Sequence, residues 1–284
     1  MPASETRTRV LVAVPGMILA LGAIYAGGWV LAALLALMAA LTARELFAMA
    51  ARKSPRPLAA LGMAGAAALV LAAGAAPADG LNNPLPAAVL ILLALAAPAV
   101  AIWSRGVQGE PLLSVATTVF GAGYAALLGF ALYLRHLPGV QDAAHAAAIL
   151  LAPVLLTWAS DSFAYFGGRA MGRTRLIPRV SPGKTVEGAL WAVVGTVAMG
   201  AAYALFLDRF GGYAPTLLQG ALFGLLVSIA AQVGDLAESA WKRDVGVKDS
   251  GTLLPGHGGA LDRFDSLLFT LPLGYAFFRF VVGY

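Results

Sequence analysis

The chain has 284 residues, of which 60% are hydrophobic and only 12% are charged. An ordinary soluble domain carries about 25% charged residues, so this composition excludes a typical water-soluble enzyme and indicates a membrane protein with many spans. The absence of cysteine excludes disulfides, thiolate metal sites and cysteine nucleophiles. A net charge of +5 is typical of basic loops that orient a membrane protein, so nucleic acid is not an expected partner.

Nine stretches are long enough to cross a hydrocarbon core, which takes about 20 residues each. The first is expected to be a retained span and not a cleaved signal, and only Gly27 and Gly28 separate it from the second. We predict an all-α polytopic membrane protein, with about five transmembrane helices in residues 1–150 and a catalytic transmembrane region in 151–284. The predicted spans are 10–26, 29–49, 58–76, 85–103, 112–134, 146–167, 186–207, 216–234 and 266–283.

The basic residues are distributed very unequally over alternate loops. With the N-terminus in the cytoplasm, 16 of the 19 Lys and Arg residues fall on the inner side, which leaves Arg135, Arg209 and Arg279 for the outer side. The positive-inside rule associates such an excess with cytoplasmic loops. We therefore expect a multi-pass protein of the inner (plasma) membrane, with a cytoplasmic N-terminus and an active site on the cytoplasmic side.

The segment 235–265 is far more charged than the average of the chain. Its 31 residues hold ten charged side chains, including six of the 14 acidic residues. Asp235 ends one apolar stretch, while Asp262 and Asp265 lie at the start of the next, and ionisable groups at membrane depth are usually functional. Oxygen ligands without Cys suit a hard cation such as Mg²⁺. The cluster indicates phosphoryl or nucleotidyl transfer, and a merely solvated loop is the plainer alternative.

A second polar region lies between the sixth and seventh predicted spans. Gly183, Lys184 and Thr185 are similar to the end of a P-loop, but Pro178 stands where that motif requires glycine, so it is not one. Ser181, Lys184 and Thr185 can still present donors to an anion just before a helix begins. Asp161, inside the preceding apolar span, is either a third functional carboxylate or a structural hydrogen-bond partner between helices.

Several motifs in the second half of the chain resemble those of one enzyme family. The longest has the pattern S-x-x-K-R, four residues, K-D, and then P-G-H-G-G, two residues, D-R-F-D. It resembles the signature of the phosphatidate cytidylyltransferases, also called CDP-diacylglycerol synthases, and the likeness covers about residues 155 to 270. Gly183 is a departure, because relatives often carry Lys there. The matching segments are 161–168, 181–188, 234–236, 239–249, 254–259 and 262–265.

The resemblance implies a reaction of CTP with phosphatidate that gives CDP-diacylglycerol and pyrophosphate, in a membrane-embedded homodimer surrounded by lipid. It also implies that Asp235 and Asp262 are the ligands of Mg²⁺ in a centre whose second ion can be K⁺. His257 either donates to a leaving oxygen or has a purely structural role. The implied catalytic residues are Asp235, Lys242, Arg243, Lys248, Asp249, His257, Asp262 and Asp265, and the implied substrate-binding residues are Asp161, Ser181, Lys184, Thr185, Ser239 and Arg263.

Two alternative functions have different consequences for the sequence. A transporter with intramembrane acids would spread its charged residues over several helix midplanes, whereas here they gather at the inner ends of the spans. A related CTP-dependent enzyme acting on another lipid phosphate or on a polyprenol is the nearer alternative. The long signature favours cytidylyl transfer to phosphatidate over kinase activity.

Overall fold

The computed structural model describes residues 3–53, 56–211, 214–251 and 258–284, with side chains from residue 14 onward. The chain divides into two compact units, and each is built from two separate segments. The first unit comprises Met1–Tyr133 and Asp244–Phe264, and the second comprises Leu134–Arg243 and Asp265–Tyr284. These compact units do not test the predicted division at residue 150 between N-terminal spans and a catalytic region, which stays a prediction.

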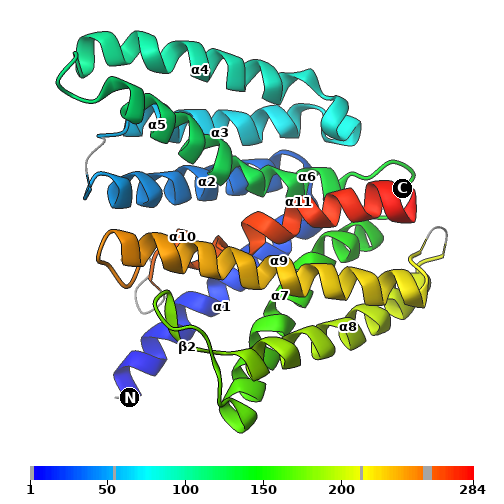
Figure 1. Cartoon of the computed structure of the whole chain (residues 1–284). Coiled ribbons are helices and arrows are strands. Elements are labelled where there is room, and N and C mark those ends of the chain that lie inside the picture. The colour runs from blue at the N-terminus through cyan, green and yellow to red at the C-terminus, as the bar shows by residue number, and fades with distance from the viewer. Residues whose placement is uncertain (1–2, 54–55, 212–213, 252–257) are drawn as a thin grey trace. The chain divides into compact units, whose positions relative to one another are not determined.

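The first unit is a group of helices (Figure 1). α3 contacts α2, α4 and α5, and the short α10 contacts α2. Apolar residues such as Phe47, Val70 and Leu128 are almost fully buried between these helices. The elements are α1 (Ala3–Ala26), α2 (Gly28–Ala50), α3 (Ala59–Ala75), η1 (Pro77–Asn82), α4 (Pro84–Ser104), α5 (Pro111–Ala125), η2 (Ala126–Gly129), the start of α6 (Phe130–Arg135) and α10 (Leu261–Phe264).

The second unit combines long helices with one small hairpin. Its longest helix, α7, packs along α8, and α11 also contacts α7. The hairpin is antiparallel and pairs Arg175 with Thr185 and Ile177 with Ser181. The elements are α7 (Ala143–Met171), β1 (Arg175–Ile177), β2 (Ser181–Thr185), α8 (Val186–Asp208), α9 (Leu217–Asp244), α11 (Leu267–Phe277) and η3 (Phe278–Val282).

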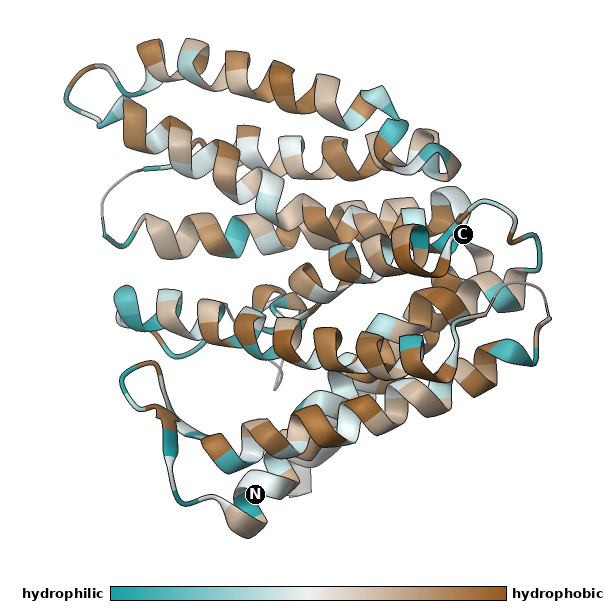
Figure 2. Cartoon of the chain, turned by 45° about the vertical axis from the view of Figure 1, so that its right-hand side comes forward, coloured by the Kyte–Doolittle hydropathy of each residue, from teal (hydrophilic) through white to brown (hydrophobic). Residues whose placement is uncertain are grey.

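Helices lie at all of the predicted span positions, and Figure 2 shows that many of their residues are hydrophobic. Among the described residues, seven helical stretches are long and apolar enough to cross a membrane, and two of these, Pro111–Arg135 and Leu261–Val282, join several shorter elements. Val14–Ala26 and Ala59–Ala75 are shorter apolar helices. The chain is therefore an all-α membrane protein, while nine spans and a cytoplasmic N-terminus stay predictions. The weak boundary at Gly27 is a true helix break, because its φ of 65° lies in the region that favours glycine.

Two local features differ from the sequence prediction. The eighth predicted span ends at residue 234, but α9 continues as a helix to Asp244. Its residues are mostly good helix formers, and Glu238 and Lys242 form an i,i+4 ion pair that favours this continuation. The β1–β2 hairpin was also not anticipated in an all-α fold. Both features belong to the region that carries the predicted site.

α8 and α9 approach each other through glycine. A Cβ atom at Gly220 would lie 2.5 Å from the Gly200 carbonyl oxygen and 2.6 Å from the Ala204 Cβ. Such contacts are too short for any side chain, so the helices need a bare backbone at this crossing. Small residues serve the same purpose at many helix interfaces in membranes.

We expect the substitution Gly220→Ala to destabilise the protein by about 1–3 kcal/mol, because the added methyl group forces the two helices apart. The matched control is Gly123→Ala in α5, where an added Cβ meets nothing within 4 Å. That change should be neutral or stabilising, since alanine is the better helix former. Thermal unfolding of the purified protein in detergent measures both, and equal melting temperatures for the two variants would contradict the expectation.

Candidate active site

A cavity of about 690 Å³ lies in the second unit among α7, the β1–β2 hairpin, α8 and α9. Both signs of charge line it, which is unusual for a chain with so few charged residues. Basic groups come from the end of α7 and from the hairpin, and carboxylates come from α7 and α9. The charged lining residues are Asp161, Arg169, Arg173, Arg175, Lys184 and Asp235.

Lys184 of β2 and Asp235 of α9 form an ion pair in the wall of this cavity. The Lys184 Nζ lies 2.5 Å from Oδ2 of Asp235, and the two side chains are 29% and 32% exposed. Ser239 lies one helical turn after Asp235 and donates its hydroxyl to Oδ1 at 3.3 Å. Both carboxylate oxygens therefore have a partner, which holds Asp235 in one orientation.

Two further carboxylates lie within electrostatic range of Asp235. The negative charge of Asp235 acts on Asp161 of α7 and on Asp265, which precedes α11. Lys184 offsets part of this repulsion at Asp161. Within the described ranges, no three His, Asp or Glu side chains are grouped closely enough to hold a metal ion by themselves. An ion bound here would complete its coordination with water or with ligand oxygens, as Mg²⁺ commonly does.

The rim of the cavity is fixed by the first turn of α8. The Thr185 hydroxyl accepts a hydrogen bond from the Gly188 N–H at 3.1 Å and so caps the helix. The Glu187 carboxylate accepts from the backbone N–H groups of Arg173 and Thr174, at 3.0 and 3.1 Å. Glu187 thereby holds the backbone between α7 and β1, the segment that presents Arg173 and Arg175.

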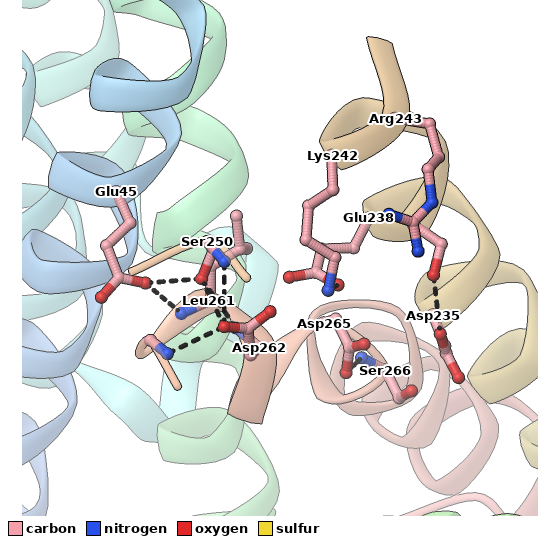
Figure 3. Close-up of polar contacts among 12 residues, drawn as sticks. Glu45, Asp235, Glu238, Lys242, Arg243, Ser250, Leu261, Asp262, Asp265 and Ser266 are labelled. Carbon is pink, nitrogen blue, oxygen red and sulfur yellow. Dashed lines mark hydrogen bonds and ion pairs between the residues drawn. The ribbon is translucent and has the colours of Figure 1, made fainter. Parts of the chain in front are cut away.

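Cationic side chains at the end of α9 also have partners. Lys242 Nζ lies 2.5 Å from an oxygen of Glu238, whose side chain is only 1% exposed. The Arg243 Nε donates to the Val180 carbonyl oxygen at 3.3 Å and ties α9 to the turn of the hairpin. Figure 3 shows both cations on the last turns of α9. These contacts give Lys242 and Arg243, two of the implied catalytic residues, a structural role within the second unit.

The Asp262 carboxylate is held by the segment around Ser250 in the first unit (Figure 3). Its Oδ2 accepts hydrogen bonds from the Ser250 N–H at 3.0 Å, the Ser250 hydroxyl at 2.9 Å and the Gly259 N–H at 2.8 Å. Glu45 of α2 contacts the same segment through the Ser250 hydroxyl. Charge-assisted bonds of this kind orient a carboxylate strongly.

The predicted site residues are divided between the two units. His257 lies outside the described residues. Asp235 belongs to the second unit and Asp262 to the first, and their predicted convergence stays a prediction. The second unit contains Asp161, Ser181, Lys184, Thr185, Asp235, Ser239, Lys242, Arg243 and Asp265, and the first contains Lys248, Asp249, Asp262 and Arg263.

Sequence reasoning missed several residues of these clusters. The arginines at 169, 173 and 175 were counted only as charges that set the orientation in the membrane, although they lie between two of the family-like motifs. Glu187 stands inside the motif 181–188, but its contact with the preceding backbone could not be read from spacing. The sequence contains one signal that could have pointed to Glu45, since it is the sole acidic residue in an apolar helix.

The sequence is similar to one protein family over nearly its whole length. A profile of the cytidylyltransferase family matches residues 7–281. The phosphatidate cytidylyltransferase of Synechocystis sp. is 37% identical over 292 residues, which cover 95% of each chain. That of Brucella abortus is 42% identical over 175 residues, covering 62% of this chain and 58% of the relative. That of Thermotoga maritima is 43% identical over 155 residues, covering 52% and 54%.

Replacing Glu187 by alanine should loosen the rim of the cavity. Two backbone donors lose a charged acceptor, so exchange of the Arg173 and Thr174 amides should accelerate by about tenfold or more. Hydrogen exchange followed by mass spectrometry measures this directly. Glu110→Ala, at an exposed position of the first unit, is the control. Unchanged exchange at Arg173 and Thr174 would show that Glu187 does not hold this segment.

Proposed function

The chain belongs to the cytidylyltransferase family, and from that premise we propose that it transfers the cytidylyl group of CTP to phosphatidate. The products are CDP-diacylglycerol, a precursor for phospholipid synthesis, and pyrophosphate. The relative that aligns over 95% of both chains carries the name of this activity. The enzyme is accordingly a nucleotidyltransferase embedded in a membrane.

The observation that carries the proposal is the mixture of charges in the cavity of the second unit. Four basic side chains line it, and such a group suits the several negative charges of a triphosphate. Two carboxylates line the same space, and they would repel an anion unless a cation lay between them. A nucleotide bound together with a divalent cation would compensate both the basic and the acidic side chains of the cavity.

The proposed reaction needs little covalent participation from the protein. A phosphate oxygen of phosphatidate forms a bond to the α-phosphorus of CTP, and the bond between that phosphorus and the bridging oxygen to the β-phosphorus breaks. Pyrophosphate leaves with the electron pair of the broken bond. Catalysis of this type depends on positioning and on electrostatic stabilisation of the phosphate oxygens. Lys184 and the arginines of the rim would supply both.

Mg²⁺ fits the donor set of the proposed site. The carboxylates of Asp161, Asp235 and Asp265 act on one another electrostatically, and a chain without cysteine offers oxygen ligands. We assign Asp235 and Asp262 as its ligands, and K⁺ as the second cation of the same proposal. When bound, the divalent ion offsets negative charge on the phosphate oxygens.

The remaining expectations from sequence complete the proposal. Lys242, Arg243 and Lys248 would assist in binding the triphosphate or pyrophosphate, and Asp249 and Asp265 would orient these cations. Ser181, Thr185, Ser239 and Arg263 would be further substrate ligands. The distribution of Lys and Arg supports an inner-membrane protein whose site opens to the cytoplasm, where CTP is available. We also propose that the enzyme is a homodimer. A CTP-dependent enzyme for another lipid phosphate or a polyprenol is the second candidate.

The direct test is an assay of the purified protein in detergent with radiolabelled CTP, phosphatidate and Mg²⁺. We expect a labelled CDP-lipid and an equal amount of pyrophosphate, and EDTA should abolish both products. Polyprenyl phosphate is tested in a parallel arm with the same label in the cytidylyl group, and polyprenol in another arm with CTP labelled at its γ-phosphate. Label transferred to either of these, and not to phosphatidate, would replace the proposed substrate with the second candidate.

Asp235→Asn should lower kcat by at least about 10²–10³-fold, the size expected when one electrostatic group of the transition state is lost. The shape of the side chain is retained, but its charge and its ion pair with Lys184 are removed. Asp208→Asn, at the exposed end of α8 in the same unit, is the matched control. If the Asp235 variant turned over CTP as the control does, Asp235 would have no part in catalysis.

A further inference from the structure

Glu45 is a buried acid in an otherwise apolar helix. It is the sole Asp or Glu of α2, and it is 7% exposed. An ionised carboxylate removed from water is strongly unfavourable unless hydrogen bonds or a cation compensate it. A position of this kind therefore requires specific partners.

The partners of Glu45 all come from the segment that contains the signature residues. Oε1 accepts a hydrogen bond from the Ala260 N–H at 2.9 Å, and Oε2 accepts from the Leu261 N–H at 2.9 Å. Oε2 also accepts from the Ser250 hydroxyl at 2.9 Å. Figure 3 shows the carboxylate pointing from α2 toward Ser250 and Leu261. One side chain thus binds both ends of the segment between Ser250 and Leu261.

Because two glycines have no side chain, there is room for the Glu45 carboxylate. A Cβ atom at Gly259 would overlap Oε2 of Glu45, and one at Gly251 would lie 2.5 Å from Oε1. Gly259 is the last glycine of the P-G-H-G-G pattern. Its lack of a side chain has a definite reason here, because any larger residue would displace Glu45.

The same hydrogen bonds connect Glu45 to Asp262. The Ser250 hydroxyl lies 2.9 Å from Oε2 of Glu45 and 2.9 Å from Oδ2 of Asp262. A hydroxyl carries one proton, so it donates to one of the two carboxylates at a time and couples their positions. Leu261, whose N–H is bound by Glu45, directly precedes Asp262. The orientation of Asp262 therefore depends on Glu45 through both the hydroxyl and the backbone.

We propose that Glu45 is a positioning residue for Asp262. It holds Ser250 and the backbone at Ala260 and Leu261, and so it sets the direction in which the Asp262 carboxylate presents itself to a divalent cation. This inference rests on the proposed function, in which Asp262 is a ligand of that cation. Groups that orient metal ligands in this way typically affect metal affinity by about 10–100-fold.

The substitution Glu45→Gln tests the inference, because one oxygen that accepts from the segment is replaced by an amide N–H₂ that cannot. The affinity for Mn²⁺ is measured by electron paramagnetic resonance on the purified protein with CTP and without lipid, beside the melting temperature and kcat. We expect Mn²⁺ to bind about 10–100-fold more weakly. Ser250→Ala, which removes only the connecting hydroxyl, should weaken binding in the same direction, and it carries the test if Glu45→Gln does not fold.

The matched control is Thr42→Val, a change on the same helix. Thr42 is fully buried, and its hydroxyl has no hydrogen-bond partner among the residues that the structure describes. This variant should keep the affinity of the wild type for Mn²⁺. The double variant of Glu45 and Ser250 should bind Mn²⁺ no more weakly than the single variant with the lower affinity, because both residues act through one set of hydrogen bonds.

The outcomes separate the inference from the proposed function. Wild-type affinity for Mn²⁺ in Ser250→Ala or in a folded Glu45→Gln protein would overturn the inference, even if the melting temperature fell, since Glu45 would then only stabilise the fold. Absence of any CDP-lipid from the wild-type enzyme would instead refute the proposed function. Weaker Mn²⁺ binding in both variants, with the control unchanged, supports the positioning role.

Discussion

Every charge that this apolar chain buries must be compensated by a specific partner, and that constraint determines the polar architecture of the molecule. Where an ionised group lies among apolar side chains, its partner is supplied by another turn, strand or helix. The buried Glu238 is balanced by Lys242 on the same helix, and the half-buried Asp235 in the cavity wall is balanced by Lys184 on the hairpin. Glu45 is balanced by backbone N–H groups and a hydroxyl. The same contacts that satisfy these charges also orient the groups proposed to act on substrate.

This constraint also explains why the two units differ in character. In the second unit the hairpin, capped by Thr185 at the start of α8 and held by Glu187, presents basic groups to the carboxylates on α7 and α9. In the first unit, by contrast, Glu45 and Asp262 are satisfied by N–H and O–H donors of a short segment. A set of fixed dipoles holds a carboxylate without neutralising it, so its charge stays available for a cation.

The helices could be predicted well because hydropathy and length alone determine where a chain can cross a membrane. The motifs in the second half of the chain likewise singled out Asp161, Lys184 and Asp235, and these residues line one cavity. The rest depended on long-range contacts. Nothing near Glu45 in sequence indicates that its partners lie more than 200 residues away. The helical continuation of α9 was missed because charge was taken as a sign of a loop, although the spacing of Glu238 and Lys242 favours a helix.

The distance along the chain between Glu45 and Ser250 has a consequence for biosynthesis. The two residues are 205 positions apart, so at a synthesis rate of about 5–20 residues per second the acid waits roughly 10–40 s for its donors. During that interval the carboxylate near the end of α2 lacks the donors that compensate it, which is unfavourable for an ionised group among apolar side chains. The nascent helix would therefore remain close to the translocation machinery or to the water interface until the C-terminal segment emerges. Completion of the first unit is thus one of the last events in the production of this protein.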